Sequence, residues 1–539
     1  MYPTKIDLKA IKRFNTLPRR PRSPSGLVGN HWHFDLRFVY LEPPGHILFL
    51  IQPESTYIYT GRLPLGIPNK SQTLLFFPES GAEAAPEVAK ALIHAFLDGF
   101  GIHQFDPKPP APYAPWSLST EDRELAAEVE KEFRRLGVRE ELCNIKATKA
   151  HVKTADKAFT QFWLTMIQGL SLPTPLMQAM VPPEGINFSV FKPRPWGEEE
   201  TPDEMERALK YAQMFHRVDV KARQLPNSQV SAQMLEKTQA AMEFLESKSS
   251  EEAQKEADAG SDAAALDYAV RIQCNIGVKP NRSLHRYYLM RVIQSDTATK
   301  EQKSQAHGLL IDWFTSSAAD SIFARYMFAA AHHANQSIIL VGDASPAVLW
   351  FGLRILEPHA KNVLALNAQY KALWLALDKR HQEISKEQEK AEKKREKNSN
   401  RYICAAPSCY IQASKGAGLL RCAGACDPAV KPSYCSKECQ RVDWKNHKPF
   451  CKHGAPCSIL TKERDLPAVS QGESGDVLTI PIAGPDGRPM MLSTSTMSPE
   501  MLKMVQAWSL GEKPEGGNKT LDELMSKSKS KSSRFEEID

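Results

Sequence analysis

The spacing of hydrophobic and polar positions changes along the chain and divides it into segments. In 30–170, short alternating or apolar stretches such as 35–40 and 73–77 come first, with Pro and Gly between them. Alternation with a period of two predicts strands that bury one face. Helical spacing follows, for example in 121–136, where every third or fourth residue is apolar. The segment therefore predicts an α+β domain that begins with a strand-rich sheet.

Helical spacing dominates the next part of the chain. In 203–380, Ala, Leu, Tyr and Phe recur three and four positions apart, in stretches separated by short breaks. Helix pairs of this kind are typical of solenoids, which offer a concave binding surface, although no fixed repeat length is visible. We expect a mostly α-helical region, with a solenoid as one candidate architecture. A polar, acidic piece at 247–260 predicts a disordered insert.

The remaining segments are interpreted from their composition. Arg, Pro and Ser crowd 1–29 and predict a flexible arm, whereas the Pro-rich segment 171–202 predicts a linker. Mixed charges with almost no apolar face at 381–400 predict a solvated helical spacer, with a nuclear localisation signal at 393–395 as the alternative. The last segment, 456–539, predicts a hairpin and a short helix, followed by a disordered tail rich in Lys and Ser.

Composition narrows the class of protein. The chain of 539 residues is too long for one domain of about 100–200 residues. The formal net charge of +6 is small beside 69 basic and 63 acidic residues, so charge alone gives no reason to expect a nucleic-acid or membrane partner. No apolar run approaches the ~18 residues of a membrane span, and no signal peptide is visible. We therefore expect a protein of the cytoplasm, the nucleus or both, without a membrane partner.

Cysteine supplies the strongest chemical signal. Eight of the ten cysteines lie between Cys404 and Cys457. Without a secretory route the compartment is reducing, so this crowding indicates metal rather than disulfides. Four pairs of Cys or His, each four or five residues apart, supply eight ligands: Cys404 and Cys409, Cys422 and Cys426, Cys435 and Cys439, and His447 and Cys451. Zinc takes four such ligands, so eight fill two sites and leave no position open for water, as in structural rather than catalytic zinc.

The end of this stretch reads Tyr434-Cys435-x3-Cys439-Gln440-x3-Trp444-x2-His447-x3-Cys451, and it closely resembles the MYND-type zinc finger. The resemblance covers roughly 404–451, under a tenth of the chain. It implies a small cross-brace finger within 401–455, in which two interleaved sets hold two ions: Cys404, Cys409, Cys435 and Cys439 for zinc 1, and Cys422, Cys426, His447 and Cys451 for zinc 2. The early pairs depart from the family, because they are spaced x4 and x3 instead of the usual x2. Cys457 is the stand-in if one ligand is misassigned.

The same resemblance implies a function. Fingers of this family bind proteins, and the residues that correspond to Gln440 and Trp444 help to form a shallow groove for short proline-containing peptides. The alternative role for Trp444 is to cover the zinc core. We therefore expect an intracellular zinc-binding adaptor with protein or peptide partners, for example a co-regulator in transcription or signalling.

Two other functions compete with the adaptor. Basic residues outnumber acidic ones around the finger, which is typical of a surface that binds nucleic acid. The basic residues are Arg401, Lys415, Arg421, Lys431, Lys437, Arg441, Lys445, Lys448 and Lys452, against Asp427, Glu438 and Asp443. The best-known enzymes with this finger are SET-domain lysine methyltransferases, but their Asn-His-Ser/Cys-x-x-Pro-Asn and Glu-Leu-x-x-x-Tyr signatures are absent from the sequence. We therefore expect no catalytic activity and keep nucleic-acid binding as the alternative.

Histidine pairs elsewhere are the remaining candidates for metal. His332 and His333 lie in an Ala-rich stretch with helical spacing, where adjacent side chains point about 100° apart and are not expected to face one metal together. His31 and His33 can share one face of a strand, but no carboxylate or cysteine partner is identifiable. Both pairs are predicted to be structural.

Overall fold

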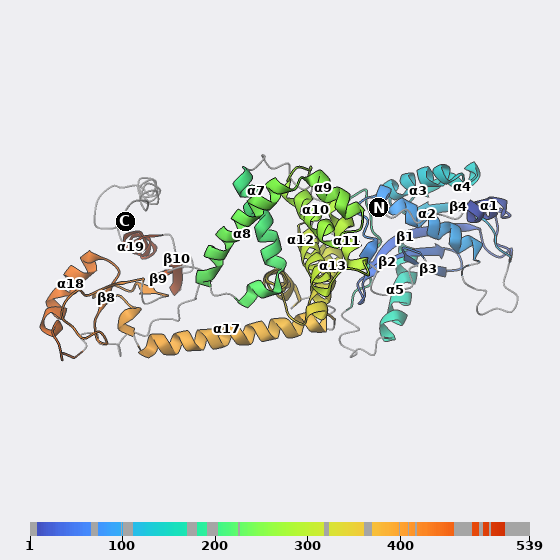
Figure 1. The fold of residues 1–539 in the computed structure, drawn as a ribbon. Coiled ribbons are helices and arrows are strands. Elements are labelled where there is room, and N and C mark those ends of the chain that lie inside the picture. Colours follow the sequence, from blue (N-terminus) through green and yellow to red (C-terminus); the bar gives the residue numbers. More distant parts are fainter. Residues whose placement is uncertain are drawn as a thin grey trace. The chain divides into compact units, whose positions relative to one another are not determined.

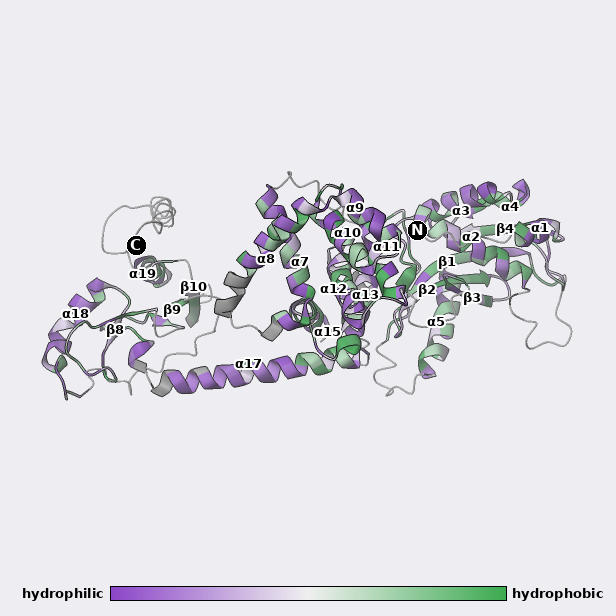
Figure 2. Ribbon diagram, viewed as in Figure 1, coloured by the Kyte–Doolittle hydropathy of each residue, from purple (hydrophilic) through white to green (hydrophobic). Residues whose placement is uncertain are grey.

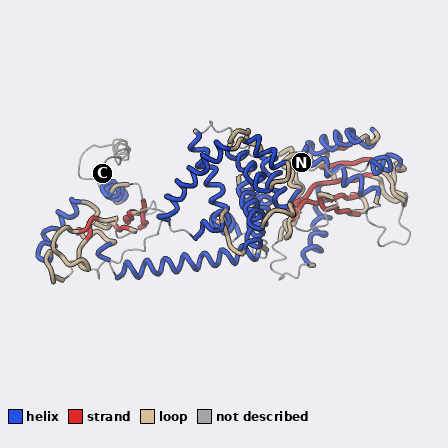
Figure 3. The backbone as a smooth tube through the Cα atoms, in the orientation of Figure 1, coloured by secondary structure: helices blue, strands red, loops and turns tan. Residues whose placement is uncertain are grey.

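The chain folds into two compact units, residues 1–380 and 381–539. The structure, a computed structural model, describes residues 8–65, 74–98, 100, 111–169, 180–190, 203–224, 227–316, 323–360, 369–397, 399–407, 409–414, 418–456, 477–483, 489–494 and 497–511. Figure 1 shows the elements in chain order, and Figure 3 shows that unit 1 combines a sheet with a region made almost entirely of helices. This arrangement confirms the α+β fold class, with a helical middle region before the cysteine-rich segment.

Unit 1 begins with a five-stranded mixed sheet in the order β3-β2-β1-β4-β5. Its strands are β1 (His31–Val39), β2 (Gly45–Gln52), β3 (Tyr57–Leu63), β4 (Ser117–Thr120) and β5 (Ile145–Ala147). The first three form an antiparallel meander, whereas β4 pairs in parallel with β1, and β5 with β4. Parallel neighbours need crossover connections. The helices α2 (Gly81–Leu97) and α3 (Arg123–Leu136) lie in these connections.

The two central strands are buried on both faces. All of β2 and all of β1 except His31 are buried, because α2 and α3 cover one face of the sheet and α5 (Val152–Gln168) lies on the other (Figure 1). The polar residues that alternate with apolar ones on β1 therefore need partners. Arg37 donates hydrogen bonds of 2.6 and 2.9 Å to Asp35 and of 2.8 Å to Asp156 on α5. Pairing of this kind offsets part of the cost of burying these charges.

Helices make up most of the described residues between 203 and 360. They are α7 (Glu204–Val218), α8 (Asn227–Ser247), α9 (Ser250–Asp258), α10 (Asp262–Cys274), α11 (Arg282–Gln294), α12 (Lys300–Thr315), α13 (Phe323–Val341), α14 (Pro346–Phe351) and α15 (Glu357–Ala360). The disordered insert expected at 247–260 is instead helix α9. Ser249 and Glu252 form a capping box at its start, and Ala253 and Ala257 are fully buried.

The N-terminal segment also differs from the prediction. Within the expected arm of 1–29, residues Leu8–Thr16 form helix α1, which buries Ala10, Ile11 and Phe14. The Phe14 ring lies 6.4 Å from the rings of Phe96 and Phe133, measured between centroids. The prediction was based on the basic composition of this stretch and did not take account of its short apolar face with helical spacing. Residues 1–7 lie outside the described residues.

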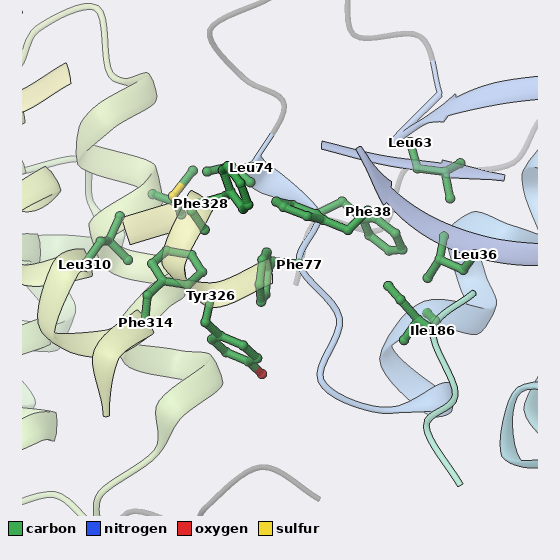
Figure 4. Close-up of a cluster of buried hydrophobic side chains, with 14 of the residues drawn as sticks. Leu36, Phe38, Leu63, Leu74, Phe77, Ile186, Leu310, Phe314, Tyr326 and Phe328 are labelled. Carbon is green, nitrogen blue, oxygen red and sulfur yellow. The ribbon is translucent and has the colours of Figure 1, made fainter. Parts of the chain in front are cut away.

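The sheet and the helices of unit 1 share one hydrophobic core instead of forming two separate domains. Phe77 joins the two parts, as Figure 4 shows: its ring centroid lies 5.8 Å from that of Phe38 on β1 and 4.8 Å from that of Phe314 on α12. A buried ion pair at 3.1 Å between Glu79 and Arg282 of α11 accompanies this contact. The predicted boundary between a domain at 30–170 and a region at 203–380 therefore crosses a continuous core.

Part of the expected Pro-rich linker packs on the sheet as well. Within 180–190, the backbone oxygen of Met180 accepts a 3.0 Å hydrogen bond from the Trp163 indole, and Phe188 is fully buried. Gly185 forms a β-bridge with Arg37. The rest of segment 171–202 lies outside the described residues.

Helix α17 (Lys371–Lys397) carries the chain from unit 1 into unit 2. Its first turns bury Leu373 and Leu377, and the residues beyond 380 are largely exposed and hydrophilic (Figure 2). The helix predicted for the charged spacer is therefore present. Among the described helices, none combines the length and the apolar character that crossing a membrane requires.

Beyond α17, the described residues of unit 2 form two small sheets and two α-helices. Its elements are β6 (Gln412–Ala413), β7 (Leu420–Arg421), β8 (Ser433–Tyr434), α18 (Lys437–His447), β9 (Leu478–Ala483), β10 (Pro489–Thr494) and α19 (Pro499–Ser509). β7 pairs with β8, and the other three strands form a sheet in the order β10-β9-β6. The hairpin and the short helix expected in 456–539 are β9–β10 and α19, and the expected disordered tail lies outside the described residues.

Candidate metal centre

Short elements of unit 2 place the eight predicted ligands. Cys404 and Cys409 lie on the turn before β6, and Cys422 and Cys426 follow β7. Cys435 follows β8, and Cys439 lies in the first turn of α18. His447 ends that helix, and Cys451 comes shortly after it. Backbone hydrogen bonds fix the first turn, in which Cys404 N donates to Ile411 O at 2.9 Å and Cys409 N donates to Ala406 O at 3.2 Å. The Ser436 side chain caps α18 by accepting from Cys439 N. Each ligand pair is thus held by local structure.

The first cluster joins Cys404, Cys409, Cys435 and Cys439, whose sulfur atoms all lie within 4.8 Å of one another. The Sγ–Sγ distance is 3.6 Å between Cys409 and Cys435 and 3.5 Å between Cys435 and Cys439. A tetrahedron with zinc–sulfur bonds of ~2.3 Å has edges of about 3.8 Å. All four side chains are buried, so the cluster has the size and the donors of a structural zinc site with four thiolate ligands.

The second cluster joins Cys422, Cys426, His447 and Cys451. The Sγ–Sγ distances are 3.7 Å for Cys422–Cys426, 3.8 Å for Cys422–Cys451 and 3.6 Å for Cys426–Cys451. His447 takes part through Nε2, which lies 3.3 Å from the Cys426 sulfur. Burial lowers the pKa of His447 below its ordinary 6.5. This favours the neutral imidazole that binds zinc.

Sequence reasoning missed a glycine that the second cluster requires. A Cβ atom at Gly424 would lie 2.2 Å from the Cys451 sulfur, so no larger residue fits there without displacing a ligand. The Gly424 N–H also points to the Cys422 sulfur at 3.4 Å. Glycine lets the backbone approach the metal ligands this closely. The sequence gives no separate signal for this role, because the approach of Cys451 is a tertiary contact.

Tyr434 contributes to the core of the finger, as the sequence predicts. Its side chain is fully buried and its hydroxyl donates a 2.8 Å hydrogen bond to Asp443 on α18. Burial and the Asp443 carboxylate raise the pKa of Tyr434 above its ordinary range. This pair connects β8 to α18 and so holds together the strand that Cys435 follows and the helix on which Cys439 lies.

Gln440 and Trp444 lie one turn apart on α18 and therefore on the same side of the helix. Gln440 is partly exposed, and Trp444 is 42% exposed. The Trp444 ring centroid lies 6.2 Å from that of His447, in an edge-to-face arrangement. Trp444 thus contacts a metal ligand while leaving much of its surface to solvent.

The other candidates belong to unit 1 and bond to its residues. His332 bonds to Glu42, and His333 to His307, at 2.8 and 2.7 Å. His31 and His33 bond to serines of the neighbouring strand β4. Within the described part of the chain, the only groups of Cys, His, Asp or Glu close enough to hold a metal ion are the two finger clusters. Cys457, the possible stand-in, lies outside the described residues.

Comparison with known families supports the assignment of the two clusters as the zinc sites of a finger. Residues 404–451 match the family model of the MYND finger, a zinc finger that serves as a protein-interaction module. No curated protein and no solved structure matches the chain. The match spans the segment from the first ligand to the last, and the two clusters fit two structural zinc ions.

Proposed function

We propose that the chain is a non-catalytic adaptor in which two zinc ions fold the MYND finger, and one side of α18 docks a short peptide. The donor count supports the absence of catalysis at the metal, because eight protein ligands for two ions leave no coordination position for water. The role of the ions is then to stabilise a segment that buries too little apolar surface to fold by itself.

The observation that carries this proposal is the bracing of α18. Cys439 in its first turn belongs to the four-cysteine cluster, and His447 at its end belongs to the other cluster. Gln440 and Trp444 lie between these two anchors. A half-exposed tryptophan on a helix fixed at both ends loses little conformational entropy when a partner binds, which favours affinity.

The test uses the full-length chain and an array of short proline-containing peptides. We expect Trp444→Ala to weaken binding to the selected peptides at least tenfold and Gln440→Ala to weaken it less, with the zinc content unchanged. Trp508→Ala is the matched control, because Trp508 is 44% exposed in the same unit but lies on α19. The proposal fails if the double change Gln440→Ala and Trp444→Ala leaves every peptide bound as tightly as before.

Nucleic-acid binding is the second candidate, since Lys437, Arg441, Lys445, Lys448 and Lys452 are all exposed around the finger. Binding driven by phosphate contacts falls steeply as salt rises, because it releases counterions. Docking of a peptide on Trp444 should depend little on salt. Titration of a DNA duplex and of a selected peptide at low and high salt, with wild type and Lys445→Ala, separates the two functions.

A further inference from the structure

The finger does not end at Cys451. After the matched segment, β9 pairs with β6, a strand of the finger, in the register Gln412↔Thr479 and Ala413↔Leu478. Ile480 of β9 and Leu502 of α19 are fully buried in one cluster with the zinc-ligating cysteines. The strand β9 and the helix α19 therefore help to form the core that surrounds the metal ligands.

Hydrogen bonds fix α19 on this extension. Gln506 donates to Pro481 O at 2.8 Å, and Ala483 N donates to the Ser509 hydroxyl at 3.1 Å. At the start of β9, Ser414 N donates to Val477 O and Val477 N donates to the Ser414 hydroxyl, at 2.8 and 3.0 Å. The position of α19 relative to the cysteine clusters is thus defined by both apolar and polar contacts.

The residue after Leu502 reaches a metal ligand. Lys503 Nζ donates a hydrogen bond of 2.7 Å to the sulfur of Cys439 and is itself half-buried. The charge of the site explains why a cation belongs there. Four thiolates around Zn²⁺ leave a net charge of −2, whereas three thiolates and a neutral imidazole leave −1. Lys503 contacts the more negative of the two sites.

We propose that Lys503 is a positioning residue for the four-cysteine zinc site: its ammonium group holds the Cys439 thiolate and slows the loss of that ion. The working finger then extends from Cys404 to Ser509. Partners that are not ligands themselves but bond to ligands commonly change metal affinity by about 10–100-fold. This inference depends on the two zinc sites but not on peptide docking.

The experiment measures zinc transfer from the full-length protein to a chromophoric chelator. Wild type should release two equivalents. Lys503→Met keeps a long, unbranched side chain but removes its charge. In this variant we expect one zinc equivalent, that of the four-cysteine site, to leave about tenfold faster and the other to leave at the wild-type rate. Lys503→Arg should restore slow release. Lys445→Met, which removes an exposed lysine from α18, should match wild type.

Cobalt substitution identifies which site is affected, because tetrathiolate and three-thiolate, one-imidazole Co²⁺ sites have different absorption spectra. Faster loss of the tetrathiolate signal alone supports the proposal. The proposal is overturned if both equivalents leave Lys503→Met at the wild-type rate, if both leave faster together, or if Lys503→Arg behaves like Lys503→Met. Peptide binding by Lys503→Arg is measured separately, so a failure of docking is not confused with a failure at the metal site.

Discussion

Gly424 offers a test of the second zinc site at the scale of one residue. Because a Cβ atom there would lie 2.2 Å from the Cys451 sulfur, Gly424→Ala should displace that ligand. We expect the purified variant to hold about one zinc ion per chain in place of two, as measured by elemental analysis. Ala423→Ser alters the exposed neighbouring side chain and should keep both ions. Full zinc content in Gly424→Ala would show that the loop takes a different path.

His285 in the core of unit 1 should make stability depend on pH. Burial lowers its pKa to about 4, against an ordinary value of 6.5, while its Nδ1 bonds to Ala269 O at 2.7 Å. On acidification, His285 takes up a proton at a higher pH in the unfolded chain than in the folded one. Its contribution to the free energy of unfolding is therefore lost as pH falls from about 6.5 towards 4. Between pH 7.5 and 5.5 the loss is about 1.3 kcal/mol.

Urea unfolding of wild type and His285→Gln at the two pH values checks this expectation. The glutamine amide can replace the hydrogen bond to Ala269 but does not titrate, so the variant should lose about 1.3 kcal/mol less on acidification than wild type does. Equal losses in wild type and His285→Gln would contradict the buried, neutral state of this imidazole.

The metal ligands and their supporting residues differ in how far the sequence reveals them. The eight ligands could be predicted, because spacing along the chain encodes ligand pairs and the Tyr434–Cys451 pattern is specific. The roles of Gly424 and Lys503 could not be predicted in the same way. The role of Gly424 depends on how closely Cys451 approaches. The role of Lys503 depends on the docking of α19, a helix that begins 48 residues after the last ligand.

Helix α1 shows the same limit at the scale of an element. The spacing of Ala10, Ile11 and Phe14 fits a helix, but a basic, Pro-containing neighbourhood led to the prediction of an arm. A short amphipathic helix is stabilised mainly by what it packs against, which local composition does not show. Helix α9 was missed for a related reason, because its polar surface conceals the two alanines that it buries.

Phe14→Ala tests whether α1 belongs to the core. The ring is fully buried and lies near Phe96 and Phe133, so its removal should lower the free energy of unfolding of unit 1 by about 3–5 kcal/mol. Lys12 is exposed on the same helix, and Lys12→Ala should change stability by less than about 0.5 kcal/mol. Urea unfolding followed by circular dichroism measures both. Similar stabilities for the two variants would mean that α1 does not belong to the core and that the segment is a flexible arm.

At the scale of the whole molecule, periodicity predicts elements but not which elements share a core. The apolar run ending at Phe77 was interpreted as a strand of the sheet, yet Phe77 lies between Phe38 of the sheet and Phe314 of the helices. Through these contacts, the two segments that were expected to be separate domains share the core of unit 1. The boundary near residue 380 could be anticipated more closely, because a charged helix without an apolar face has little to bury.

The two units should respond differently when zinc is removed. The core cluster of unit 1 ends at Leu377, and that of unit 2 consists of the zinc-ligating cysteines and residues packed on them, up to Leu502. A chelator should therefore make 418–456 sensitive to trypsin while 262–316 of unit 1 resists digestion, because only the second core depends on metal. Mass spectrometry of the fragments locates the cuts, and added zinc should restore protection. Equal digestion of 262–316 and 418–456 after chelation, or unchanged protection of 418–456, would mean that metal binding and the fold of the finger are not coupled.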